Sequence, residues 1–269
     1  MDNRPIGVFD SGLGGLTAVK ELMHQLPEES IVYFGDTGRV PYGTRSNETV
    51  IKYVFQDIRF LMGFDIKLII IACGTASSIA LETVQNEFDV PIVGVVHSTA
   101  EQAVKMTKNK KIGIIGTQGT INSGAYQRKV MELDREVEIY SKACPLFVPL
   151  VENGYIDKEV TRLVAEEYLS SLISSQVDTL ILGCTHYPLL KKVIRDIMGE
   201  HVNLIDPGVE VARYVKTFLR QKDMLSAPEH QSTYKYFVSD SIENFSNLGS
   251  LFLQKEISDI VEKIDIEKY

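Results

Sequence analysis

Short apolar runs alternate with amphipathic stretches along the whole chain. The runs predict buried strands at residues 6–9, 31–34, 69–73, 91–95, 111–117, 180–184, 202–206 and 234–238. The amphipathic stretches predict helices between them, among others at 16–26, 50–62, 74–84, 160–173 and from 209 onward. Apolar residues three and four positions apart lie on one face of a helix. Alternating strands and helices indicate an α/β fold, with mainly parallel sheets flanked by helices on both faces.

This pattern begins again near the middle of the chain. The run at 111–117 resembles the opening strand, and each half contains a strand that ends in a cysteine. We therefore expect two similar α/β lobes with the active site in the cleft between them. The first lobe is expected at residues 1–95 plus 209–269, because the C-terminal segment is too short to form a domain alone. The second lobe is expected at residues 96–208, with hinges near both of its ends.

Composition narrows the class of protein. The chain has 269 residues, of which 44% are hydrophobic, enough for one large core or two smaller ones. It contains no uninterrupted run of about 18 apolar residues, so we expect no membrane span. The N-terminus lacks a basic segment followed by an apolar one, which argues for a cytoplasmic rather than a secreted protein. The net charge of −8 argues against nucleic-acid binding.

The chain has three cysteines, Cys73, Cys144 and Cys184. No CxxC pair or His/Cys spacing suits zinc, so no metal site is predicted, and the sparse, odd count fits reduced thiols. Cys73 and Cys184 each end an apolar strand, where open α/β sheets bind their ligands. Buried cysteines are common in protein cores, but the repetition of this setting in both halves favours a functional role. Cys144 lacks the setting and is expected to be structural.

Two thiols that face one another across a cleft would suit a proton-transfer reaction at carbon. One thiolate would remove a proton from one face of the carbon, and the other thiol would return a proton to the opposite face. Both cysteines precede an expected helix start, where unsatisfied N–H groups lower the pKa of a thiol. Thr75 and Thr185 follow closely and are expected to cap these helices or to bind a ligand.

Further polar residues lie at the same strand ends. Asp10 and Ser11 could hold the ammonium and carboxylate groups of a substrate, although either could be a helix cap. Thr117 and Thr120 are hydroxyl donors in the second half, and they too could bind a substrate or only cap a helix. His186 could shuttle protons for Cys184 or simply pack in the core. Glu152 is a candidate to orient the His186 ring.

A dinucleotide fingerprint is matched only superficially. Gly12-x-Gly14 follows the first strand and Asp36 follows the second, but Thr17 occupies the third glycine position. Asp10 would also place a negative charge near the pyrophosphate. We therefore expect no nicotinamide or flavin cofactor.

Several segments together resemble the glutamate racemases, cofactor-independent enzymes that supply D-glutamate for bacterial peptidoglycan and cell-wall biogenesis. The matching segments are 9–17, 35–37, 41–43, 71–76, 116–120, 144–152 and 182–190, and the resemblance spans nearly the whole chain. The last segment is the most specific one, because related aspartate racemases and maleate isomerases usually carry an acidic residue where His186 stands.

The resemblance implies roles for individual residues. Cys73 would act on D-glutamate and Cys184 on L-glutamate, while Asp10 and His186 would assist the thiols on their own sides. The implied substrate pocket consists of Asp10, Ser11, Pro41, Tyr42, Gly43, Gly74, Thr75, Thr117, Thr120, Thr185 and His186. The resemblance also implies a homodimer.

Two positions depart from the family's pattern. Gly74 stands where the family has asparagine after the first cysteine, and His97-Ser98 stands where Pro-Gly is usual. An asparagine amide beside the thiol would reach the charged groups of the substrate. We therefore expect an active enzyme that is handicapped at this position and improved by Gly74→Asn.

Three other functions are compatible with parts of the pattern. A racemase or isomerase of another amino acid, such as aspartate, is opposed by His186. A catalytically impaired paralogue with a binding or regulatory role is favoured by Gly74 and opposed by both strand-end cysteines. A thiol hydrolase needs a histidine placed against its nucleophile, and His186, two residues from Cys184 on a tight turn, is expected to be poorly placed for that.

Overall fold

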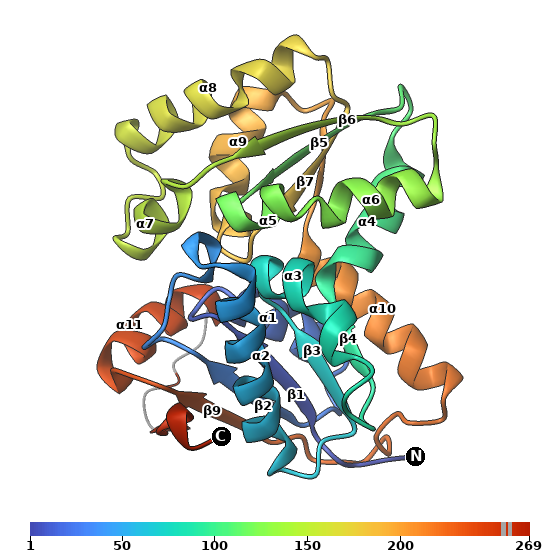
Figure 1. Ribbon diagram of the computed structural model, residues 1–269, viewed down its shortest axis with the longest axis vertical. Helices are drawn as coiled ribbons and strands as arrows, with labels where there is room; N and C mark the ends of the chain where they lie inside the picture. Colours follow the sequence, from blue (N-terminus) through green and yellow to red (C-terminus); the bar gives the residue numbers. More distant parts are fainter. Residues whose placement is uncertain (254–256, 258–259) are drawn as a thin grey trace.

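The computed structural model describes residues 1–253, 257 and 260–269 and contains two parallel sheets, one in each of two stacked lobes (Figure 1). The strands are β1 (Ile6–Asp10), β2 (Ile31–Gly35), β3 (Leu68–Ile71), β4 (Ile92–Gly94), β5 (Lys111–Gly116), β6 (Glu138–Ala143), β7 (Thr179–Gly183), β8 (Asn203–Ile205), β9 (Tyr234–Val238) and β10 (Val261–Lys263). The two-lobed α/β architecture expected from the sequence is confirmed.

Helices connect the strands. They are α1 (Leu16–Gln25), α2 (Asn47–Met62), α3 (Gly74–Val84), α4 (Val95–Met106), α5 (Gln118–Ser123), α6 (Ala125–Leu133), α7 (Phe147–Glu152), α8 (Glu159–Ser174), α9 (Lys191–Met198), α10 (Pro207–Gln221) and α11 (Ile242–Leu253). Short 3₁₀ turns η1 (Tyr42–Thr44), η2 (Tyr187–Leu190) and η4 (Ile266–Lys268) complete the described elements. No helix in the described ranges is long and apolar enough to cross a membrane.

The first sheet has six parallel strands in the order β10-β9-β2-β1-β3-β4. Its interior strands β1 and β3 are buried along their whole length, as expected for a parallel sheet covered on both faces. α1, α10 and α11 cover one face and α2 and α3 the other. The C-terminal strands β9 and β10 extend this sheet from β2, so the end of the chain packs with its beginning. Residues 254–256 and 258–259 of the expected first lobe lie outside the described residues.

The second sheet has four parallel strands in the order β6-β5-β7-β8. α4 and α6 pack on one face, and α7, α8 and α9 on the other. β1 lies beside β3, which leads to Cys73, and β5 lies beside β7, which leads to Cys184. The two lobes therefore repeat one arrangement. The chain passes between the lobes at α4 and α10, which pack against each other. The lobe boundaries at residues 95/96 and 208/209 stay a prediction.

The structure differs from the sequence reading in several elements. β6 was not expected, because its side chains are half-buried or exposed and it has no apolar run. The strand expected at 91–95 is shorter, because Val95 already begins α4 and donates its backbone N–H to Ser77 Oγ at 3.0 Å. α4 thus begins where hydrophobicity alone would have continued the strand.

Candidate active site

Cys73 and Cys184 lie at matching places in the two lobes. Cys73 follows β3, which pairs with β1, and Cys184 follows β7, which pairs with β5. Both residues are buried, with 5% and 6% of their surface exposed. The carboxyl ends of both sheets therefore carry a thiol beside the central strand, as the sequence predicts.

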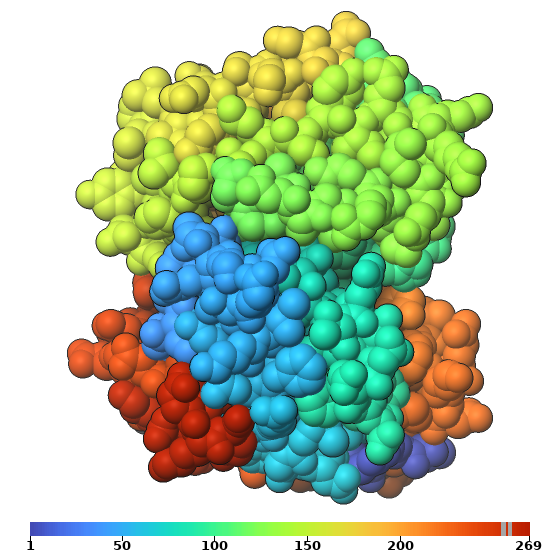
Figure 2. All heavy atoms as spheres, in the orientation of Figure 1, coloured from blue at the N-terminus to red at the C-terminus, as the bar shows by residue number. Residues whose placement is uncertain are grey.

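The two strand ends meet at the boundary between the lobes. A Cβ atom placed on Gly74 would lie 2.4 Å from the carbonyl oxygen of Gly183. Thr75 Oγ1 lies 2.8 Å from Thr117 Oγ1, and Thr185 Oγ1 donates to Asp10 Oδ2 at 3.3 Å. On the face seen in Figure 2 the atoms of the two lobes also touch, where the segment after β2 lies against α5. The structure therefore brings the cysteine-bearing segments together.

Cys73 is the N-cap residue of α3, with its Sγ accepting a hydrogen bond from Ala76 N at 3.5 Å. The thiol donates to Ser11 Oγ at 3.5 Å. Burial, reinforced by the nearby Asp10 carboxylate, raises the pKa of Cys73 to about 12. The expectation that the helix start lowers the pKa of this thiol is therefore wrong, because the loss of solvent outweighs one N–H donor.

Cys184 is paired with the histidine two residues later. Its Sγ lies 3.9 Å from His186 Nδ1, and His186 Nε2 lies 2.9 Å from Glu152 Oε1. Burial disfavours the charged ring, but the hydrogen bonds to Cys184 and Glu152 outweigh it and raise the pKa of His186 to about 10. His186 is then an imidazolium at neutral pH. The expectation that the His186 ring is poorly placed against the thiol is wrong, because the turn into η2 points the ring back at Cys184.

Asp10 joins the two halves of the site. It is fully buried at the end of β1, and its Oδ1 accepts from Gly12 N at 3.0 Å. Its Oδ2 accepts the Thr185 hydroxyl from the other lobe. Burial raises the pKa of Asp10, while the charge of His186 acts in the opposite direction.

The threonines expected in the pocket form one hydroxyl cluster across the boundary. Thr75 Oγ1 contacts both Thr117 Oγ1 and Thr120 Oγ1, and the last two lie 3.0 Å apart. Thr117 also caps α5 by accepting from Thr120 N at 3.2 Å. Thr120 itself is fully buried. The capping reading is therefore confirmed for Thr117, and its ligand-binding role stays a prediction.

The loop at residues 41–43 contacts the second lobe through Gly43. A Cβ atom on Gly43 would lie 2.7 Å from Thr117 Cβ. The Tyr42 side chain is buried, and its hydroxyl is bonded to Asp36 and Asp57. The Tyr42 hydroxyl is therefore engaged by carboxyl groups of its own lobe, and Pro41 lies exposed beside it.

Gly74 has no room for a side chain in this arrangement. The atom nearest to its missing Cβ is a backbone carbonyl oxygen, which cannot rotate away as a flexible side chain would. Gly74 has no positive φ angle, so the need for glycine is one of space. On this geometry we expect asparagine to disturb this position rather than to improve it.

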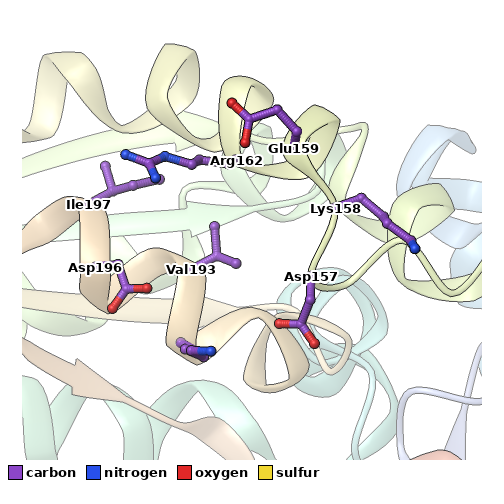
Figure 3. Close-up of a pocket in the computed structure, with 8 residues that line it drawn as sticks. Asp157, Lys158, Glu159, Arg162, Val193, Asp196 and Ile197 are labelled. Atoms are coloured by element: carbon purple, nitrogen blue, oxygen red, sulfur yellow. The ribbon is translucent and has the colours of Figure 1, made fainter.

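Two features lie apart from the cysteine pair. Cys144 is completely buried in the core beneath α7, with its Sγ 3.7 Å from Lys142 O. A cavity of about 240 Å³ between α8 and α9 is lined by side chains of both charges and by none of the expected site residues (Figure 3). Its lining consists of Asp157, Lys158, Glu159, Arg162, Lys192, Val193, Asp196 and Ile197. A smaller cavity, of about 140 Å³, borders Glu152 and α11 beside the candidate site.

Sequence reasoning missed the polar group behind loop 41–43. Arg39 and Asp57 are buried and bonded to one another, and Asp57 projects from the apolar face of α2. The sequence did carry one signal for this group. Asp57 is a charged residue seven positions after Val50, on the helical face that is otherwise apolar. Within the described ranges, no group of three or more His, Cys, Asp or Glu residues is placed to hold a metal ion.

Comparison with known proteins agrees with this geometry. The family model described as Asp/Glu/Hydantoin racemase matches residues 13–215. A glutamate racemase of Geobacter metallireducens is 47% identical over 266 residues, covering 98% of both chains.

Solved structures give the same result. A glutamate racemase isoform from Bacillus anthracis has a TM-score of 0.95 and 40% identity, with 98% of each chain covered. The Francisella tularensis glutamate racemase, solved in complex with D-glutamate, has a TM-score of 0.93 and 40% identity over the whole of both chains. The relatives that match the chain over its full length are glutamate racemases. The chain therefore belongs to the Asp/Glu/Hydantoin racemase family.

Proposed function

We propose that this chain interconverts L-glutamate and D-glutamate, with Cys73 and Cys184 as the two acid/base groups. The observation that carries the proposal is the pair of thiols at the facing strand ends of two similar lobes. The relatives that match over the full length are glutamate racemases, and one of them binds D-glutamate in its crystal structure.

The proposed reaction needs one thiolate and one thiol. The thiolate removes the α-proton, and the electron pair of the broken C–H bond stays on the α-carbon beside the substrate carboxylate. The opposite thiol then gives its proton to the other face of that carbon and becomes a thiolate. Each turnover therefore exchanges the protonation states of the two cysteines, and inversion needs no other reactant.

The surroundings of the two thiols differ. His186 is positively charged beside Cys184, whereas burial near a carboxylate raises the pKa of the Cys73 thiol. We assign Cys184 as the group that takes the proton from L-glutamate and Cys73 as the group that delivers a proton to the opposite face. The Glu152 carboxylate keeps the His186 ring charged and oriented.

The remaining expected residues supply the substrate pocket. Asp10 and Ser11 lie beside Cys73, and the main chain of loop 41–43 and the hydroxyls of Thr75 and Thr117 lie at the lobe boundary. We assign Thr185 and the main chain at Gly74 to the same pocket. Hydroxyls and backbone N–H groups bind carboxylates without competing for the α-proton.

Isotope exchange tests the two-thiol mechanism directly. Purified protein incubated with L-glutamate in heavy water, without added cofactor, should form D-glutamate that carries deuterium at the α-carbon. At early times the remaining L-glutamate should still carry its original proton, because separate groups serve the two faces. Rapid deuterium entry into unreacted substrate would instead indicate a single base. Aspartate serves as the comparison substrate, and faster turnover of aspartate would overturn the assignment to glutamate.

Cysteine variants test the roles of individual thiols. Cys73→Ser and Cys184→Ser should each lower racemisation by about 10²–10⁴-fold, the usual contribution of a general acid or base. Cys73→Ser should still exchange the α-proton of L-glutamate, and Cys184→Ser that of D-glutamate. The buried Cys144→Ser is the matched control and should retain most activity. Near-normal turnover in either strand-end variant would remove that cysteine from the mechanism.

The biological setting follows from the product. We propose that the protein acts in the cytoplasm, as a homodimer, to supply D-glutamate for peptidoglycan. The support is the resemblance to glutamate racemases over the whole chain. Sedimentation velocity at several protein concentrations tests the dimer, and a monomer throughout would contradict it.

A further inference from the structure

A buried charge cluster lies behind the loop at residues 41–43. Asp36 follows β2, Arg39 lies just before the loop, Tyr42 lies in the loop, and Asp57 comes from α2. Asp36 and Asp57 are fully buried, and Arg39 and Tyr42 are 9% and 1% exposed. Burying so many polar groups lowers the stability of the fold unless every hydrogen-bond donor and acceptor has a partner.

Arg39 organises the cluster. Its Nε donates to Asp36 Oδ2 at 2.6 Å, and its Nη2 donates to Asp57 Oδ1 at 3.0 Å. Its Nη1 donates to Gln56 Oε1 at 2.6 Å and lies 3.4 Å from Glu267 Oε1 at the C-terminal end. The guanidinium also lies 4.1 Å from the centre of the Tyr53 ring. Arg39 is thus fixed from several sides.

The Tyr42 hydroxyl has one proton but two carboxyl partners. It lies between Asp36 Oδ2 and Asp57 Oδ2, the second at 3.0 Å. Ionised carboxylates only accept hydrogen bonds. If the phenol proton is donated to one carboxylate, the contact with the other therefore requires a proton on that carboxyl group.

The hydrogen bonds indicate which carboxyl holds this second proton. Asp36 Oδ2 already accepts from Arg39, and its Oδ1 accepts from Ser239 Oγ at 2.8 Å. Among the described residues, Asp57 Oδ2 has only the Tyr42 hydroxyl as a partner. A proton on Asp57 Oδ2 can therefore be donated to the phenol oxygen, while Tyr42 donates to Asp36.

The charge balance leads to the same assignment. One guanidinium faces two fully buried carboxyl groups, while the third acid, Glu267, is largely in solvent, with 62% of its side chain exposed. Two buried carboxylates would leave an uncompensated negative charge. Burial, together with the neighbouring Asp36 charge, raises the pKa of Asp57 well above its ordinary value.

We infer that Asp57 is a neutral acid at neutral pH and that, with Asp36 and Arg39, it is a positioning residue for loop 41–43. Tyr42 opens the turn η1, and the next residue, Gly43, contacts Thr117 of the other lobe. Fixing the Tyr42 ring therefore fixes the main chain that we assign to the glutamate pocket. The positioning role rests on the proposed function, whereas the protonation state does not.

Infrared difference spectroscopy tests the protonation state without substrate. In heavy water at neutral pH, subtracting the Asp57→Asn spectrum from that of the wild type should reveal the C=O band of a protonated carboxyl group. The Asp36→Asn difference should reveal only carboxylate bands. Loss of carboxylate bands in Asp57→Asn would overturn the assignment, even if the chain proved inactive on glutamate.

Kinetics of the same variants tests the positioning role. Asparagine resembles a protonated aspartate, so Asp57→Asn should keep kcat/KM within about threefold of the wild type, while Asp57→Ala should lose about tenfold or more. Asp36→Asn removes a needed charge and should raise KM for both enantiomers by about tenfold or more. Asp65→Asn, at an exposed aspartate, is the matched control.

Two outcomes would contradict the positioning role. One is equal damage in Asp57→Asn and Asp36→Asn, since the two carboxyl groups would then be equivalent. The other is an unchanged KM in Asp36→Asn and Asp57→Ala with only a lower melting temperature, which would indicate a purely structural cluster. If Asp36→Asn does not fold, the wild-type and Asp57→Asn spectra still decide the protonation state.

Discussion

Gly74 shows how a single missing side chain defines the boundary between the lobes. Its Cα approaches the carbonyl of Gly183 so closely that any Cβ would overlap with it. Gly74→Asn should therefore force the lobes apart and lower kcat/KM in both directions by about tenfold or more, since catalysis falls steeply when reacting groups are misplaced. Steady-state kinetics of Gly74→Ala and Gly74→Asn measures this, and a higher kcat/KM in Gly74→Asn would contradict it.

His186 makes stability depend on pH. Its pKa is about 10 in the folded protein and about 6.5 in an unfolded chain, so the folded state binds the proton more tightly. This stabilisation is complete below about pH 6.5 and is lost as the pH rises through about 10. Between pH 7 and 8.5 the wild type should lose up to about 1.4 kcal/mol of unfolding free energy per pH unit. His186→Gln should show a clearly shallower slope in urea denaturation, and equal slopes would exclude a charged His186.

The sequence pointed to the strand-end residues that the structure brings together, but not to all of their contacts. Cys73, Cys184 and Asp10 could be found because each directly follows an apolar strand, and strand ends converge at one edge of a parallel sheet. The orientation of Tyr42 could not be found. Its hydroxyl points to Asp57 on a helix packed behind the loop, and only tertiary packing brings that helix there.

A buried ion pair joins elements at the amino ends of the strands of the first sheet. Lys67 precedes β3, and its Nζ lies 2.5 Å from Glu29 Oε2, with both side chains at most 2% exposed. The ammonium also donates to the carbonyl oxygens of Asp2 and Met224 at 2.6 and 2.8 Å. Lys67 therefore ties the N-terminal segment, the start of β3 and the segment after α10 together.

Removing this lysine alone should be strongly destabilising. Lys67→Met leaves the Glu29 carboxylate buried without a cation and should cost about 3–5 kcal/mol of unfolding free energy. The double variant Lys67→Met/Glu29→Gln should recover part of that loss. Lys105→Met in the exposed pair with Glu101 is the matched control and should change stability by about 1 kcal/mol or less. Urea denaturation measures all three, and similar losses in both single variants would contradict this reading.

At the level of elements, the sequence predicts the strands that are apolar because they are buried. Strands buried on both faces, such as β1, β3 and β7, stand out as continuous apolar runs. β6 lies at the edge of its sheet and is half-exposed, so its sequence Glu138–Ala143 carries no such run. Its place is determined by pairing with β5, a long-range interaction that local patterning does not encode.

At the level of the whole molecule, the second sheet is inserted within the first. The chain leaves the first sheet after β4, builds β5 to β8, and returns through α10 to β9 and β10. Because α4 and α10 pack together, the exit and the return lie side by side. This arrangement explains how two lobes that share one hydrophobic cluster can bring their strand ends to one boundary.

The late return of β9 has a consequence for synthesis of the protein on the ribosome. β2 pairs with β9 through residues such as Ile31 and Tyr234, which lie far apart in the chain. During translation the edge of β2 therefore emerges long before its partner, with apolar residues and unpaired backbone groups exposed. The inserted lobe has no such delay and can fold first. We therefore expect the nascent first lobe to be the part of this protein that is most exposed to aggregation during synthesis.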